Sequence, residues 1–159
     1  MDRIKLLLAC CVLGAGVLRL VGQEPTPLGV FTPAQAEAGR VAYEKTCGKC
    51  HTTRLLGRRG DAGELPPVSS LSATYQEFIQ AYGPVPPLAG KDFTARWGSK
   101  TVAQLISRFQ EAVNAFPPDG MTDATTVEIT AYALQVSGAK AGSRRLTRAS
   151  DVTVSSITH

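Results

Sequence analysis

Five consecutive residues, Cys47 to His51, combine the side chains most able to do chemistry in this chain of 159 residues. Their order is Cys-Gly-Lys-Cys-His, the Cys-x-x-Cys-His pattern that attaches c-type haem. Two thiols at this spacing can add to the two vinyl groups of one porphyrin, and the histidine that follows is then held at the iron as its proximal ligand. The pattern therefore predicts one covalent haem c, with Cys47 and Cys50 as thioether anchors and His51 as a metal ligand.

Other kinds of site use the same residue types. A thioredoxin-like dithiol would need a β-strand leading into the motif, whereas the residues before Cys47 have apolar positions at helical spacing. A zinc site needs more Cys or His ligands, and only His159 accompanies His51 once an amino-terminal export segment is removed. A disulfide between Cys47 and Cys50 would be strained. We therefore favour haem attachment over these three alternatives.

Helical patterns surround the motif. Capping boxes at 32–35 and 101–104 predict two helix starts, because each pairs a threonine with a glutamine three residues later. Alternation typical of a strand occurs only at 152–157, which is too isolated to form a sheet. The expected fold class is all-α, with long loops and about four helices: one that begins at Pro33 and leads into the motif, then 72–82, 101–115, and Thr122 or Asp123 to Gln135 or Val136.

The amino terminus has the layout of a secretory signal. Two basic residues precede an uncharged run from Leu6 to Leu18, which is shorter than the roughly twenty apolar residues of a spanning helix. We expect residues 1–22 to be a cleaved signal peptide, with an exported, periplasmic protein and no stable membrane span. The alternatives are an uncleaved amino-terminal tether and a lipoprotein signal that ends at Cys10.

Composition and charge exclude several classes of protein. With 43% hydrophobic and 19% charged residues, the chain is neither a polytopic membrane protein nor a coiled coil. The formal charge of +4 is not arranged as a basic stripe interleaved with aromatic residues. Arg58-Arg59 is an isolated pair and the other excess basic residues lie in the tail, so we expect solvated charges and no nucleic-acid partner.

Together these features resemble a class I c-type cytochrome over nearly all of residues 33–138. The resemblance implies a small all-α fold in which about four helices wrap one covalently bound haem. In this family a glycine of the first helix meets the last helix beside an aromatic residue, and Gly39 and Tyr132 occupy these positions, with Tyr43 one turn after Gly39. The domain is thus expected to span 33–138, followed by a weakly ordered extension at 139–159.

The resemblance also implies further haem contacts. The residues from Pro86 to Gly90 resemble a Pro-x-Leu-x-Gly segment whose proline carbonyl accepts the Nδ1 hydrogen of the proximal histidine, so Pro86 is expected to orient His51. Trp97 resembles the tryptophan that lies near the haem propionates. The alternative for Trp97 is that it fills the core.

The sequence leaves two alternatives for the distal side of the haem: ligation by Met121, or an open site covered by Phe116. Family members carry Met-Pro shortly before the last helix, whereas this chain has Phe116-Pro117-Pro118 there and Met121 after it. Met121 is the preferred distal ligand, since it is the only methionine left after export. In the alternative, Met121 packs as a hydrophobic residue and Phe116 covers an open site that would admit small molecules.

The function implied by the resemblance is one-electron transfer by an electron carrier that is not itself an enzyme, either on its own or as a subunit of an oxidoreductase complex. The tail resembles the extension of exported cytochromes found alongside PQQ-dependent (quinoprotein) dehydrogenases, which implies such a dehydrogenase and a terminal oxidase or other cytochrome as redox partners. A haem-based sensor or weak peroxidase with an open distal site is the alternative. The interval 52–85 is longer than in small family members and forms either a partner surface or a lid over the haem edge.

Overall fold

The computed structural model describes residues 29–58 and 68–158, and helices are the regular elements within these ranges. Pairing of β type is limited there to two isolated bridges, so the expected all-α class is confirmed. The signal segment expected at 1–22 lies outside the described residues. The elements are α1 (Pro33–Lys45), α2 (Gly48–His51), a 3-10 turn η1 (Val68–Ser70), α3 (Ala73–Tyr82), α4 (Lys91–Trp97), α5 (Val102–Ala115), α6 (Asp123–Val136) and a second 3-10 turn η2 (Val154–Ser156).

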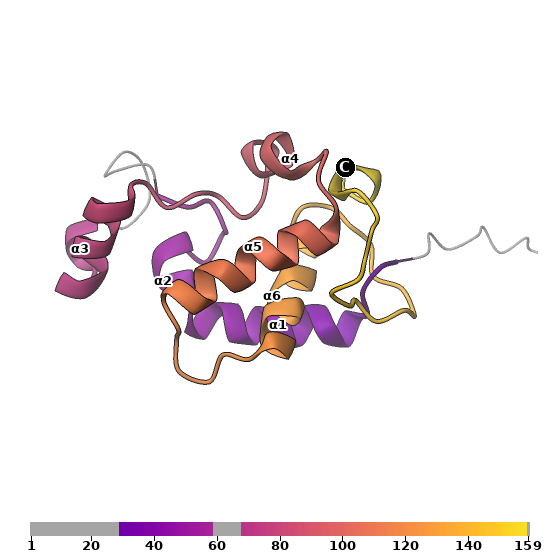
Figure 1. Ribbon diagram of the computed structural model, residues 1–159, viewed down its shortest axis with the longest axis horizontal. Helices are drawn as coiled ribbons and strands as arrows, with labels where there is room; N and C mark the ends of the chain where they lie inside the picture. The colour runs from indigo at the N-terminus through magenta and orange to yellow at the C-terminus, as the bar shows by residue number, and fades with distance from the viewer. Residues whose placement is uncertain (1–28, 59–67, 159) are drawn as a thin grey trace, which may run out of the picture.

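Helices α1 and α6 cross at the centre of the molecule (Figure 1). At the crossing, a Cβ atom added to Gly39 would overlap the backbone of Glu128 and Ile129 in α6. The ring centroids of Tyr43 and Tyr132 lie 5.5 Å apart on the same two helices. The close crossing expected at Gly39 is confirmed, because only a residue without a side chain lets the two backbones approach this closely.

The helix starts follow from local hydrogen bonds. At α1, the Thr32 hydroxyl accepts from the Gln35 amide at 3.2 Å, and the Gln35 side chain accepts from the Thr32 amide at 3.3 Å. Thr101 and Gln104 repeat this pattern at α5, with distances of 3.2 and 3.0 Å. Both predicted capping boxes are confirmed, and each satisfies two of the amides that a helix start leaves unpaired.

One longer helix and one single turn were not expected from the sequence. Helix α4 begins after Gly90, which has φ +81° and offers no side-chain cap, so no capping pattern marks it. Its Phe93 is fully buried, and the helix packs against η2 near the end of the chain. At this contact the Ser155 amide donates to the Gly98 carbonyl at 3.0 Å. The helix therefore depends on a partner far away in the sequence. The single turn α2 forms around the Cys-x-x-Cys-His motif.

The residues after α6 pack on the domain, in contrast to the weakly ordered extension expected at 139–159. The backbone of Leu146 exchanges two hydrogen bonds with the buried side chain of Gln35, at 3.0 and 2.7 Å. The Val102 amide donates to the Val152 carbonyl at 2.9 Å, and Val154 is fully buried. In Figure 1 the carboxyl end lies beside α4. The expectation rested on the polar average composition of this segment, which does not reveal the few apolar side chains that hold it in place.

Helix α5 presents an apolar stripe to the core, and α3 does not. Val102, Leu105, Ile106 and Phe109 of α5 are buried, as their helical spacing predicts. No residue of α3 is buried, and Figure 1 shows this helix standing apart from α1, α5 and α6. Within the described ranges, none of the helices has the length and apolar character needed to cross a membrane.

Candidate functional site

The Cys-x-x-Cys-His motif forms the single helical turn α2. The amides of Cys50 and His51 both donate to the Cys47 carbonyl, at 3.1 and 2.8 Å. Residues three and four positions apart lie on one face of a helix, so this turn places both thiols and the imidazole on the same side. Cys47 and Cys50 are free thiols, and each is partly exposed.

The imidazole of His51 is oriented by a backbone carbonyl. Its Nδ1 atom lies 2.8 Å from the carbonyl oxygen of Pro86, the contact expected from the sequence. A carbonyl can only accept, so Nδ1 carries the hydrogen and the neutral ring keeps its lone pair at Nε2. Burial lowers the pKa of His51, with the hydrogen bond to Pro86 acting in the opposite direction. Neutral imidazole with a free Nε2 lone pair is the form that ligates a metal.

The two thiols lack the features of a redox-active dithiol. Burial raises the pKa of Cys47, although a hydrogen bond from the Thr46 hydroxyl at 3.4 Å acts against this. Burial also raises the pKa of Cys50, against the opposing positive charge of Arg58. Reactive dithiols have lowered pKa values, and a helix rather than a strand leads into this motif. The raised pKa values of the thiols and the preceding helix therefore disfavour the thioredoxin-like alternative.

Contacts from α1 support the residues that follow the motif. The buried Tyr43 hydroxyl donates to the Thr52 carbonyl at 2.6 Å. Thr52 has φ +65°, a backbone conformation that residues with side chains rarely adopt. The Gly57 amide then donates to the His51 carbonyl at 3.0 Å. The chain is thus turned back on itself directly after the histidine, and one side chain of the α1–α6 crossing holds it there.

Arg58 was missed by sequence reasoning, which placed it with Arg59 as a solvated pair. In the structure Arg58 is only 4% exposed. Its Nε and Nη2 atoms donate to the carbonyls of Cys50 and Lys49, at 3.1 Å each. The expectation was wrong because nothing near Arg58 in the sequence shows that its partners are carbonyl oxygens of the motif.

The other predicted site residues lie against the core. Trp97 at the end of α4 and Met121 before α6 are both partly buried and pack on the hydrophobic core. Phe116, which caps the end of α5, is 43% exposed, and its ring lies 3.8 Å, centroid to centroid, from that of Phe78 in α3. The structure therefore brings together Cys47, Cys50, His51 and Pro86, and gives Trp97 and Met121 contacts typical of packing residues.

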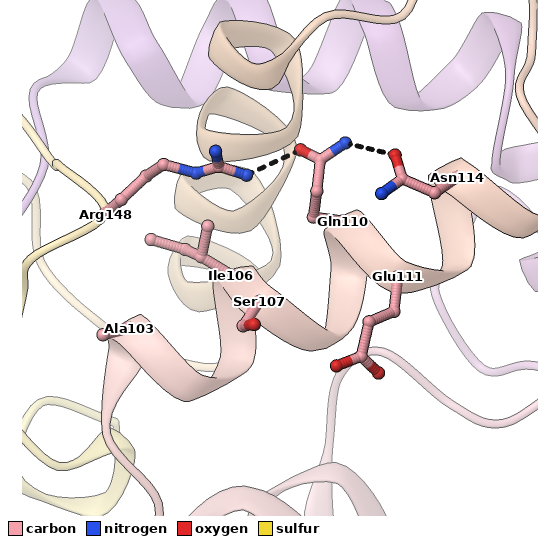
Figure 2. Close-up of a pocket in the computed structure, with 7 residues that line it drawn as sticks. All are labelled: Ala103, Ile106, Ser107, Gln110, Glu111, Asn114 and Arg148. Carbon is pink, nitrogen blue, oxygen red and sulfur yellow. Dashed lines mark hydrogen bonds between the residues drawn. The ribbon is translucent and has the colours of Figure 1, made fainter.

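A surface hollow of about 450 Å³ lies between α5 and Arg148 of the segment after α6. Figure 2 shows that Arg148, from the segment after α6, reaches over it and donates to Gln110, which in turn bonds Asn114. Arg148 also pairs with Asp123 at 2.6 Å. No predicted haem-binding residue lines the hollow, whose lining in the described structure is Ala103, Ile106, Ser107, Gln110, Glu111, Asn114 and Arg148.

The fold and the site define a c-type cytochrome domain. The family model described as cytochrome c oxidase, cbb3-type, subunit III matches residues 34–132, which include the Cys-x-x-Cys-His turn, Pro86 and Met121. The match covers more than half of the chain, so the chain belongs to this family of cytochrome c domains. Neither the curated proteins nor the solved structures gave a match. Membership supports haem c as the cofactor and haem-based electron transfer as the general function.

The residues present fit such a cofactor. Two free thiols share one face of α2 with an imidazole whose Nδ1 hydrogen is already taken by Pro86. Across the described ranges, no group of three or more His, Cys, Asp and Glu side chains could hold a metal ion in another way. The donor set is therefore that of a haem attachment turn.

Proposed function

We propose that this protein carries one electron at a time through a single haem c, attached covalently at Cys47 and Cys50 and ligated by His51. The observation that carries the proposal is the 2.8 Å contact between the Pro86 carbonyl and Nδ1 of His51, which follows the two thiols in the same helical turn. When bound, haem supplies the one-electron exchange between ferrous and ferric iron.

The chain's own residues would hold and orient that group. Pro86 fixes the tautomer and the ring orientation of His51, and its carbonyl makes Nε2 a better electron donor. The α1–α6 crossing keeps Tyr43 in place, and Tyr43 supports the backbone just after the histidine. This rigid support suits an electron carrier, because a ligand that does not move between oxidation states needs little reorganisation.

Haem loading tests the proposal directly. The chain is produced in a host with a cytochrome c maturation system, and we expect haem staining that survives a denaturing gel, with reversible one-electron reduction. Changing both Cys47 and Cys50 to Ser should abolish the staining, whereas Ser107→Ala at an exposed position of α5 should not. A wild-type protein that matures without haem and retains titratable thiols would contradict the proposal.

Met121 is our proposed distal ligand. It is the only methionine among the described residues, and it lies partly buried beside the core just before α6. Thioether ligation should give ferric protein a weak long-wavelength absorbance that Met121→Ala and Met121→Leu both lose. The leucine variant is the sharper one, because it keeps the packing and removes only the sulfur.

The core packing of Met121 and the 43% exposure of Phe116 favour a second candidate, an open distal site. In that case the protein would act as a haem-based sensor or weak peroxidase. A high-spin ferric spectrum in the wild type, unchanged in Met121→Leu, together with binding of CO or peroxide, would support this candidate over the electron carrier.

We further propose export to the periplasm and electron transfer from a periplasmic quinoprotein dehydrogenase to a terminal oxidase or another cytochrome. The apolar run at Leu6–Leu18 and the attachment of c-type haem outside the cytoplasm support export. The likeness of the tail to that of dehydrogenase-associated cytochromes supports the partner. Cell fractionation with amino-terminal sequencing tests the first proposal, and stopped-flow reduction by such a dehydrogenase tests the second. Retention in the cytoplasm, or no reduction above a mixing control, would refute them respectively.

A further inference from the structure

A closed circuit of hydrogen bonds joins α2 to the segment that orients His51, and Arg58 is the residue that closes it. The guanidinium of Arg58 donates to the carbonyls of Lys49 and Cys50, at 3.1 Å each. The Arg58 amide donates to the Val85 carbonyl at 2.8 Å. The next carbonyl along the chain, that of Pro86, accepts from His51. One arginine thus holds both the turn that carries the histidine and the segment that orients it.

Arg58 is almost fully buried, so its charged side chain depends on hydrogen bonds within the protein. A guanidinium that is 4% exposed has lost nearly all of its water and needs acceptors within the protein. The carbonyls at the end of a helix lack partners inside the helix. The planar fork of arginine can reach two such carbonyls at once, which a lysine ammonium does less well. Because the donor is charged, these hydrogen bonds are stronger than neutral ones.

The backbone just before Arg58 also lies against the 85–88 segment. Gly57 has φ +69°, and a Cβ atom there would overlap the backbone of Val85 and Pro86. Two residues earlier, the Leu55 carbonyl accepts from the Leu88 amide at 2.8 Å. Residues 55–58 therefore run closely alongside 85–88, and the side chain of Arg58 returns from this pair to α2.

We infer that Arg58 is a positioning residue for the proximal histidine, clamping the Cys-x-x-Cys-His turn to the 85–86 segment so that the Nδ1 hydrogen of His51 stays on the Pro86 carbonyl. The inference rests on the proposed function, in which His51 is the ligand. With haem bound, the positive charge of Arg58 beside the turn would disfavour the additional positive charge of ferric iron, so removing this charge should lower the reduction potential.

Solvent exchange of the His51 Nδ1 hydrogen, followed by NMR in the reduced holoprotein, measures the clamp. Arg58→Met keeps the apolar stem and removes both donors and the charge, and we expect exchange to become at least about tenfold faster, with a lower reduction potential. Arg58→Lys keeps the charge without the fork and should fall between Arg58→Met and the wild type. Lys49→Met, which removes an exposed charge of the same turn, is the matched control and should leave the exchange unchanged.

The outcomes separate this inference from the proposed function. Equal Nδ1 exchange in wild type and Arg58→Met would overturn the inference, as would equal acceleration in Lys49→Met. If Arg58→Met does not accumulate as holoprotein, Arg58→Lys decides: intermediate exchange supports the clamp, and exchange at the wild-type rate overturns it. Backbone amides of α5 and α6 should exchange as in wild type, which distinguishes a local clamp from general destabilisation. A wild type without haem would instead refute the proposed function.

Discussion

The α1–α6 crossing and helix α3 show two different ways in which a helix can belong to this domain. Helix α6 buries half of its residues, and its backbone touches that of α1 at Gly39. Helix α3 buries none, and its aromatic contact with the rest of the domain is made through Phe78 and Tyr82 to Phe116. The crossing is therefore part of the frame that supports the site, whereas α3 can change without moving that frame.

The largest effect should come from breaking the crossing. Gly39→Val places a side chain where the α6 backbone lies, so we expect a loss of more than about 3 kcal/mol in the free energy of unfolding. Chemical denaturation measures it. Ala34→Val, on an exposed part of α1, introduces the same side chain and should cost less than about 1 kcal/mol. Similar losses in the two variants would contradict a close crossing.

A smaller effect should show that the segment after α6 belongs to the frame. Val154→Ala removes buried methyl groups next to α4 and should cost about 2 kcal/mol. The exposed Thr153→Ala serves as control and should stay within about 0.5 kcal/mol of the wild type. A thermal unfolding midpoint for Val154→Ala equal to that of its control would mean that this segment is not packed in solution.

The hydrogen bond that joins the α1–α6 crossing to the residues after the motif should contribute somewhat less to the free energy of unfolding. Tyr43→Phe keeps the ring and removes the hydroxyl that donates to the Thr52 carbonyl, so we expect a loss of about 1.5 kcal/mol. Tyr132→Phe is the control, since it leaves the Thr52 carbonyl bonded. Urea unfolding of the two variants gives the comparison, and equal stabilities would show that the Tyr43 contact does not support the turn.

The smallest effect is expected in α3. Phe78→Ala removes the ring that meets Phe116, yet both rings are partly exposed, so the domain should lose less than about 1 kcal/mol. Amide hydrogen exchange should instead rise across Ala73–Tyr82 while that of α5 stays unchanged. A loss of stability as large as that of Val154→Ala would show that α3 supports the domain as the α1–α6 crossing does, and would contradict the difference between the two regions.

Features formed by residues close together in the sequence were mostly predicted correctly. The capping boxes at Thr32 and Thr101 depend on residues three positions apart, and both were read correctly. The crossing at Gly39 followed from family resemblance, because the pattern of one helix does not reveal which helix it meets. The contact between His51 and Pro86 was likewise expected from the resemblance and is present at 2.8 Å.

The features that sequence reasoning missed depend on distant partners. Helix α4 is short, starts without a capping side chain and rests on η2. Arg58 has the same sequence character as a solvated arginine, and only the return of the chain at Val85 makes it a buried donor to α2. Neither contact leaves a periodic pattern, because each is formed by residues that are far apart along the chain.

The pairing of Arg58 with Val85 has a consequence for how this protein can be remodelled. Arg58 and Val85 stand at the two ends of the connecting segment 59–84, and these two ends are hydrogen-bonded to each other. Because the entropy of closing a loop depends only weakly on its length, whatever joins these ends can be shortened, extended or exchanged at little cost. The connection between Arg58 and Val85 is thus a place where new recognition sequences can be grafted close to the proposed haem attachment turn, because the hydrogen bonds from His51 to Pro86 and from Arg58 to α2 do not pass through it.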